Sequence, residues 1–158
     1  NEEIHIMPKE FIMRGSTASG TEEVLNFGAQ ARPGYGYRMT ELQIYPSSSI
    51  GSQGAELSLT ITAANSAEDP SNPNFNNSGL IAVSMLGVRT DVQNGSFVDH
   101  TIVNDLFVIT QDLILSAVDT LTGNPQSTNW QIRLEEIKLS SGAEAVANFK
   151  QYTIYNTG

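Results

Sequence analysis

The strongest constraint on the fold comes from the stretch Thr101–Leu139. Its apolar, β-branched runs are separated by the turn-rich residues 122–127, which include Gly123, Asn124 and Pro125. These residue types between two such runs are typical of a strand–loop–strand unit, because glycine and asparagine tolerate turn conformations and proline cannot donate to a sheet ladder. We therefore expect an all-β fold that is built around this unit.

The first half of this stretch has two interpretations. A helix would carry an apolar stripe at i, i+3, i+4 and i+7 spacing that contains Val103, Leu106, Phe107, Thr110, Leu113, Ile114, Ala117 and Val118. Other apolar residues would lie off that stripe, namely Ile102, Val108, Ile109 and Leu115. β-Branched side chains lose freedom on a helix and pack well on a pleated surface. We therefore favour a strand that is buried between two layers, or two strands that bend at Gln111 and Asp112.

Alternation of apolar and polar residues predicts most of the other strands. It is strictest between Leu57 and Ala63, which predicts a strand with one buried face and one wet face. Between Met39 and Leu42 the alternation changes phase, which predicts a β-bulge in the strand over residues 37–45. Further strand candidates are residues 4–13, where Pro8 indicates an edge or bent strand, and residues 23–27, 80–88 and 152–155.

Loops are expected where small and polar residues gather. Residues 14–20 form one such segment, and Asn94-Gly95 indicates a tight turn. Residues 64–78 are rich in Asn and Pro and predict a long loop of the kind that carries contacts. The chain is thus expected to form one antiparallel β-sandwich domain of jelly-roll type over residues 1–158, with eight or nine strands. At most one short helix is expected, near residues 143–149.

Charge and composition narrow the classes of partner. The formal net charge is −9 with only eight Lys and Arg residues, which argues against direct contact with nucleic acid because phosphate binding needs a basic patch. No apolar run approaches the roughly 20 residues that span a bilayer. The chain has no cysteine and therefore no thiolate metal site or thiol nucleophile. Charged residues are only 16% of the chain, as is common in secreted and particle-forming β proteins.

Candidate catalytic residues are few, and each has a simpler structural explanation. His100 follows Asp99, but neighbours on a strand point to opposite faces, so this carboxylate would not orient the imidazole. Glu135 and Glu136 would diverge in the same way, whereas a glycosidase needs two carboxylates that face each other across a cleft. We therefore expect a protein that is not an enzyme.

No cofactor is expected, although calcium stays an alternative. Calcium takes oxygen ligands, and five aspartates recur at six- to eight-residue intervals around the central stretch: Asp91, Asp99, Asp105, Asp112 and Asp119. Aspartate is also an ordinary turn residue, and no D-x-D-x-D loop is present.

A contact surface is the remaining kind of site. Tyr35 and Tyr37, flanked by glycines, are the best candidates for an aromatic platform on which a sugar ring could stack, and Tyr45 is a further one. Trp130 shares a strand face with Ile132 and Leu134, so core packing is expected for it. Phe75 and Asn76 in the long loop complete the candidate contact surface.

The chain resembles a single jelly-roll structural protein of a small viral or phage particle. The resemblance rests on the entry Gly34-Tyr35-Gly36-Tyr37 into a strand, on the Asn/Pro-rich loop and on the segment Asn129–Glu136. It covers most of the chain at the level of architecture, and no functional residue is carried over from it.

The resemblance implies a subunit that self-assembles, alone or with other particle proteins, into a capsid, decoration or vertex structure, located in a virion or extracellularly. A genome-packaging capsid protein usually has a basic arm, which this chain lacks, unless an arm precedes Asn1. The alternative is a carbohydrate-binding or adhesin module of the same architecture.

Overall fold

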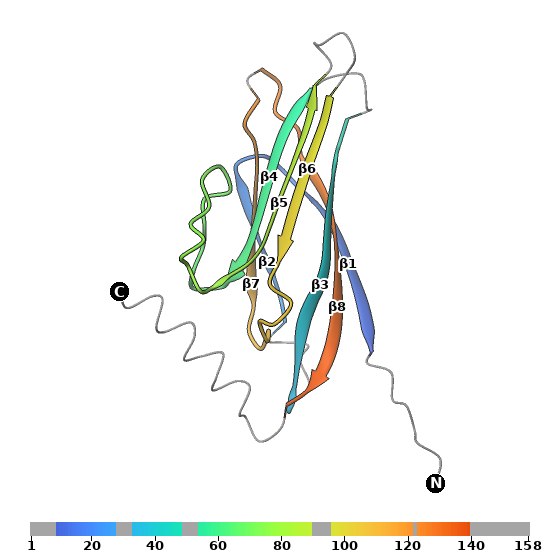
Figure 1. Cartoon of the computed structure of the whole chain (residues 1–158), viewed down its shortest axis with the longest axis vertical. Helices are drawn as coiled ribbons and strands as arrows, with labels where there is room; N and C mark the ends of the chain where they lie inside the picture. Colours follow the sequence, from blue (N-terminus) through green and yellow to red (C-terminus); the bar gives the residue numbers. More distant parts are fainter. Residues whose placement is uncertain (1–8, 28–32, 49–53, 90–95, 122, 140–158) are drawn as a thin grey trace.

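The computed structural model describes residues 9–27, 33–48, 54–89, 96–121 and 123–139, which form a β-sandwich (Figure 1). The eight strands are β1 (Glu10–Thr17), β2 (Thr21–Leu25), β3 (Tyr35–Pro46), β4 (Ala55–Ala63), β5 (Leu80–Arg89), β6 (Ser96–Val103), β7 (Leu113–Asp119) and β8 (Thr128–Lys138). No helix occurs in these residues. The predicted all-β antiparallel sandwich is therefore confirmed. The strands expected at residues 4–6 and 152–155, the turn at Asn94-Gly95 and the helix near residues 143–149 lie outside the described residues.

Two antiparallel sheets make up the sandwich. The smaller sheet has the order β1-β8-β3, and the larger has the order β2-β7-β4-β5-β6. An eight-stranded jelly roll is a long hairpin rolled up, in which strand 1 pairs with 8, 2 with 7, 3 with 6 and 4 with 5. Three of these pairs are present here, whereas β6 bonds to β5 and only approaches β3. The strand order is thus consistent with a jelly-roll architecture in which β6 has joined the larger sheet.

The core lies between the facing sides of the two sheets. Met39, Leu59, Ile61, Leu115 and Ile132 are fully buried there. The expected bulge in β3 is also present, because its register with β8 shifts between Met39 and Glu41. It reverses the alternation, so that Met39 before it and Leu42 after it both face the core.

Residues 14–17 belong to β1, so the loop expected at residues 14–20 is shorter than predicted. Gly15 lies opposite Trp130 of β8, and the indole ring packs directly on its Cα position. The Trp130 Nε1–H donates a hydrogen bond to Thr17 Oγ1 at 3.0 Å. The small residues 15–17 at the end of β1 thus continue the strand and accommodate a large side chain from a distant strand. Trp130 is a core residue, as expected, with 5% exposure.

The predicted strand over residues 101–110 is interrupted. β6 ends at Val103, and the Asn104 side chain accepts the Leu106 amide at 3.2 Å in an Asx-type turn. Leu106 is 77% exposed, whereas the next residue, Phe107, is 2% exposed. Further along, Ile109 exchanges two backbone hydrogen bonds with Tyr37, at 2.7 and 2.9 Å. The segment between β6 and β7 is thus an irregular connection with a buried apolar stretch, neither one strand nor a helix.

Candidate functional site: an apolar groove on the larger sheet

The outer face of the larger sheet carries exposed apolar side chains near its β6 edge. The cross-strand register places Met85 beside His100, and Gly87 beside Val98. Met85 is 44% exposed, Val98 46% and Ile102 57%. Because alternate residues of a strand share a face, Val98, His100 and Ile102 point to the same side. Exposed apolar residues that gather in this way mark interaction surfaces more often than isolated ones do.

The loop of residues 64–79 rises beside this face (Figure 1) and is tied to it by backbone carbonyls. Ser58 Oγ donates to the Pro70 carbonyl at 2.6 Å, and Thr60 Oγ1 donates to the Glu68 carbonyl at 3.2 Å. Inside the loop, the Glu68 carboxylate accepts the Asn74 amide and the Asn77 side-chain amide, each at 2.9 Å. The loop is therefore ordered by its own polar residues, which leaves its apolar ones free to face outward.

Phe75 is 59% exposed on this loop. With the sheet face, the loop encloses a groove of about 360 Å³. Its apolar lining is Leu57, Pro70, Pro73, Phe75, Val83, Met85, Leu86 and Ile102, and His100 also borders it. A groove of this composition can take up an apolar side chain or strand, and it offers little for acid–base chemistry.

The four predicted contact residues do not come together. Phe75 lines the groove, and Asn76 is its exposed neighbour. Tyr37, however, is only 8% exposed, and its ring centroid lies 5.5 Å from that of Phe27. Tyr37 is therefore largely a core residue that shares the inward phase of Met39 on β3, and it borders a further hollow of about 430 Å³ together with Phe11 and Phe27. Tyr35, at the start of β3, is half-buried.

Sequence reasoning missed Met85, Val98 and Ile102. They belong to segments whose apolar residues fall on both faces, so alternation could not tell which ones would stay exposed. Val98 and Ile102 are exposed because β6 lies at an edge of the sheet. That position depends on the pairing between strands, which only the structure reveals.

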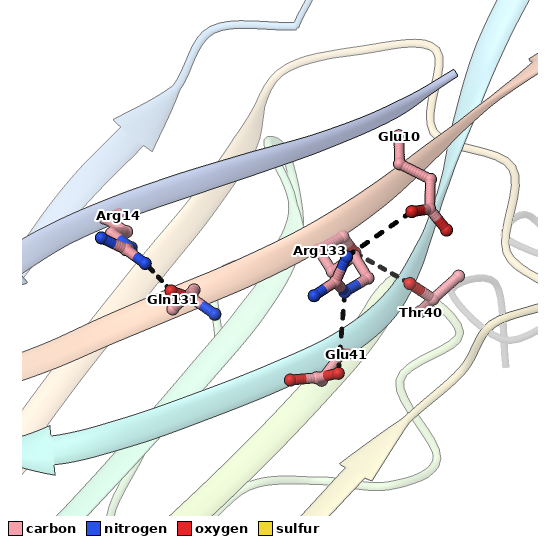
Figure 2. Close-up of polar contacts among 6 residues, drawn as sticks. All are labelled: Glu10, Arg14, Thr40, Glu41, Gln131 and Arg133. Carbon is pink, nitrogen blue, oxygen red and sulfur yellow. Dashed lines mark hydrogen bonds and ion pairs between the residues drawn. The ribbon is translucent and has the colours of Figure 1, made fainter. Parts of the chain in front are cut away.

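The outer face of the smaller sheet is mainly polar, although Ile12 and Tyr45 are also exposed on it. Figure 2 shows Arg133 of β8 reaching Glu10 of β1 at 3.5 Å and Glu41 of β3 at 3.7 Å. Beside it, Arg14 Nε donates to Gln131 Oε1 at 2.6 Å. These are solvent-exposed contacts and contribute little to stability. The contrast between the two outer faces makes the larger sheet the better candidate for an interface.

A second hollow, of about 430 Å³, borders Tyr45 of β3. Tyr45 is 57% exposed. The polar residues that line this hollow are Arg14, Gln43, Asp99, Thr101, Asn129 and Gln131. An exposed tyrosine ring with amide and carboxylate groups around it has the chemistry that recognises a sugar.

The residues weighed for catalysis and for calcium are dispersed. Asp99 lines the hollow near Tyr45 whereas His100 lines the groove, so the two point to opposite faces as expected. Asp119 is buried, and its carboxylate accepts the backbone amides of Glu56, Leu121 and Gln126 at 2.9–3.0 Å. Asp119 therefore has a structural role at the turn after β7.

Within the described part of the chain, no three acidic or histidine side chains are grouped so that they could hold a metal ion. The same residues contain no helix long and apolar enough to cross a membrane. Asp91, one of the five aspartates considered for calcium, lies outside them.

Comparison with known proteins adds no family to this description. The chain matches no protein-family profile, and no curated protein matches it significantly.

Proposed function

We propose that this chain is a structural subunit that assembles with copies of itself, and with other particle proteins, into a virion shell or surface assembly such as a capsid, decoration or vertex. The observation that carries the proposal is the apolar groove beneath residues 64–79, on a sandwich whose strand order is consistent with a jelly roll. Folds of this kind recur in viral shells. A subunit of a shell needs apolar surface that stays exposed until its neighbours cover it.

The net charge of the chain predicts how assembly should depend on salt concentration. Each copy carries a formal charge of −9, so copies repel one another over distances comparable to the Debye length. Added salt screens this repulsion while leaving apolar contacts intact. Assembly should therefore increase with ionic strength, whereas an interface dominated by ion pairs would weaken.

The test is the mass of the purified protein in solution, measured by light scattering over a range of concentration and salt, with negative-stain images of the same samples. Shells, rings or other higher-order particles that increase with salt are expected. A 17.1 kDa monomer under all these conditions would contradict the proposal.

A pair of variants tests whether the groove takes part. Phe75→Ser removes an exposed aromatic side chain from the groove and should reduce assembly. Leu106→Ser removes the most exposed large apolar side chain of the described residues, 77% exposed, and this residue does not line the groove. Equal effects of the two variants would show that general surface hydrophobicity, rather than the groove, drives association.

The hollow beside Tyr45 favours a second candidate function, a carbohydrate-binding or adhesin module. Stacking on the exposed Tyr45 ring and hydrogen bonds from Gln43, Asn129 and Gln131 would hold a sugar there. On this hypothesis, a glycan array gives a defined binding signal that Tyr45→Ala abolishes without changing the mass in solution. Absence of any glycan signal for the unmodified protein would reject it.

A further inference from the structure

Among the described residues, β6 is an edge strand of the larger sheet. It hydrogen-bonds to β5 alone, β3 of the smaller sheet only approaches it, and each residue from Val98 to Ile102 is exposed. An exposed edge strand presents unpaired backbone N–H and C=O groups and is a template for pairing with another chain. In Figure 1 this strand is long and nearly straight.

The hydrogen-bond phase of β6 determines which of its residues face the free edge. The amide of Asn104, just past the strand, donates to the Ile81 carbonyl of the β5 side at 2.8 Å. Backbone groups alternate in direction along an antiparallel strand, so even-numbered residues of β6 bond toward β5. Asp99 and Thr101 therefore direct their backbone N–H and C=O groups to the free edge. If β6 of a second copy binds there, its odd-numbered residues must lie opposite the odd-numbered residues of the first copy to form backbone hydrogen bonds.

The sequence of β6 is complementary to itself in one such register. When His100 lies opposite His100 of a second copy, Val98 lies opposite that copy's Ile102, and Asp99 lies opposite its Thr101. Apolar residues thus meet apolar residues on the outer face, and on the other face each Asp99 carboxylate meets a Thr101 hydroxyl, which also shares a hydrogen bond with Ser84 Oγ at 2.7 Å. Shifting the centre to Asp99 would place two carboxylates directly opposite each other, which is unfavourable. Shifting it to Thr101 would pair His100 with Ile102.

We propose that two copies of this chain associate through an antiparallel β6–β6 pair centred on His100, which joins their two five-stranded sheets into one continuous sheet. This contact rests on the proposed function and names one of its interfaces. It would extend the apolar strip of Val98 and Ile102 across the two-fold axis, because a two-fold contact uses the same patch on both copies.

The size of this contact indicates how strong it can be. The five residues from Val98 to Ile102 span about 17 Å at roughly 3.3–3.4 Å per residue. One strand of this length buries a few hundred Å² per copy, which is well below the ~800 Å² per partner of a stable interface. The isolated pair is therefore weak and depends on concentration, and it becomes stable only in an assembly that has further contacts.

Single cysteines test the register directly, because the chain contains no cysteine of its own. In the proposed pair, His100 and its symmetry mate occupy a non-hydrogen-bonded site with Cα atoms about 4.5 Å apart, within the range that a disulfide bridges. His100→Cys should therefore form a disulfide-linked dimer under mild oxidation, seen by non-reducing electrophoresis. Val98→Cys is the matched control on the same face, because the two Val98 residues are four positions out of register, about 13 Å apart.

A rate of dimer formation at least tenfold higher for His100→Cys than for Val98→Cys is the expected result. Similar rates, or no dimer with His100→Cys, would overturn the proposed pair. If particles still appear by light scattering in that case, the contact is wrong while the proposed function stands; if the protein stays a monomer, both fail.

A second pair of variants gives an independent readout. Ile102 on β6 and Val24 on β2, the opposite edge of the same sheet, are each 57% exposed. Ile102→Lys and Val24→Lys change the net charge equally, so a difference between them reports a contact on the outer face around β6. Ile102 also lines the groove, so this pair tests that face as a whole, whereas the cysteine pair tests the register of the β6–β6 contact. We expect Ile102→Lys to weaken self-association at least tenfold relative to Val24→Lys, and equal association of the two would overturn the proposal.

Discussion

Replacing Gly15 by alanine should destabilise the protein far more than the loss of one strand glycine would suggest. A Cβ atom at this position would lie 2.8 Å from Trp130 Cε2 and closer still to Cζ2, so the indole must move. The ring has little freedom because its Nε1–H donates to Thr17 Oγ1 in a buried site. The Trp130 ring thus packs directly on the backbone of Gly15.

The magnitude follows from three contributions. Overpacking a filled core costs about 1–3 kcal/mol. If the indole turns to make room, its buried N–H loses its acceptor, which costs about 1–3 kcal/mol more. Alanine restricts the unfolded chain relative to glycine and so recovers about 0.5–1 kcal/mol. The net change in the free energy of unfolding is therefore a loss of about 3 kcal/mol, with extremes of about 1 and 5.5 kcal/mol.

Gly87 provides the matched control, since it also lies inside a strand but its added Cβ would meet nothing closer than 3.9 Å. Gly87→Ala should be neutral or stabilise by up to about 1 kcal/mol. Urea unfolding followed by far-UV circular dichroism at low protein concentration measures both variants. Repeating Gly15→Ala in a Trp130→Phe background should remove much of its cost, because the smaller ring leaves room. Equal costs for Gly15→Ala and Gly87→Ala, or an unchanged cost beside phenylalanine, would refute this account.

Two further predictions concern carboxylates. Asp119→Asn replaces an oxygen that accepts a backbone amide by an NH₂ group, so it should lower the free energy of unfolding by about 1.5–3 kcal/mol, against less than 0.5 for the exposed Asp105→Asn in the same urea titration. Hydrogen bonds from the Ser71 hydroxyl, and then from its backbone amide, hold the pKa of Asp69 below its ordinary value. The stabilisation from these bonds is complete above about pH 3.9 and is lost as the pH falls through the lowered pKa. Hydrogen exchange at the Ser71 amide should therefore gain protection between pH 2 and pH 5 relative to Asp69→Asn, and parallel profiles would contradict this.

Much of the fold was predictable from local patterns. The strict alternation from Leu57 to Ala63 identified β4, and the change of phase after Met39 identified the bulge in β3. The wet face expected for β4 was wrong, because Thr60 and Thr62 on that face are 0% and 1% exposed. Both signals lie within a few residues of the positions that they describe. The inward position of Tyr37 could have been predicted in the same way, because Tyr37 and Met39 are two residues apart and lie on the same face of the strand.

What the local patterns missed depends on distant partners. Residues 14–17 look like a loop until Trp130 is placed against Gly15, from a strand more than 100 residues away. The break after Val103 was obscured because the apolar run of residues 106–109 outweighed the turn residues Asn104 and Asp105. The sequence predicted Phe75 of the groove but not its exposed sheet residues Met85 and Ile102. Their exposure depends on which strand lies at the edge of the sheet.

The central place of β8 in the smaller sheet also dictates an order of events during synthesis. β1 and β3 bond to β8 and not to each other, so the smaller sheet cannot begin to form until Thr128–Lys138 has been made. At about 5–20 residues per second, β1 waits roughly 6–24 s for its partner. β4 and β5 are consecutive in the chain and can pair early, because residues 64–79 that join them are far fewer than the residues between β1 and β8. The larger sheet can therefore form before the smaller one, and β1 stays without its β8 partner until late in synthesis.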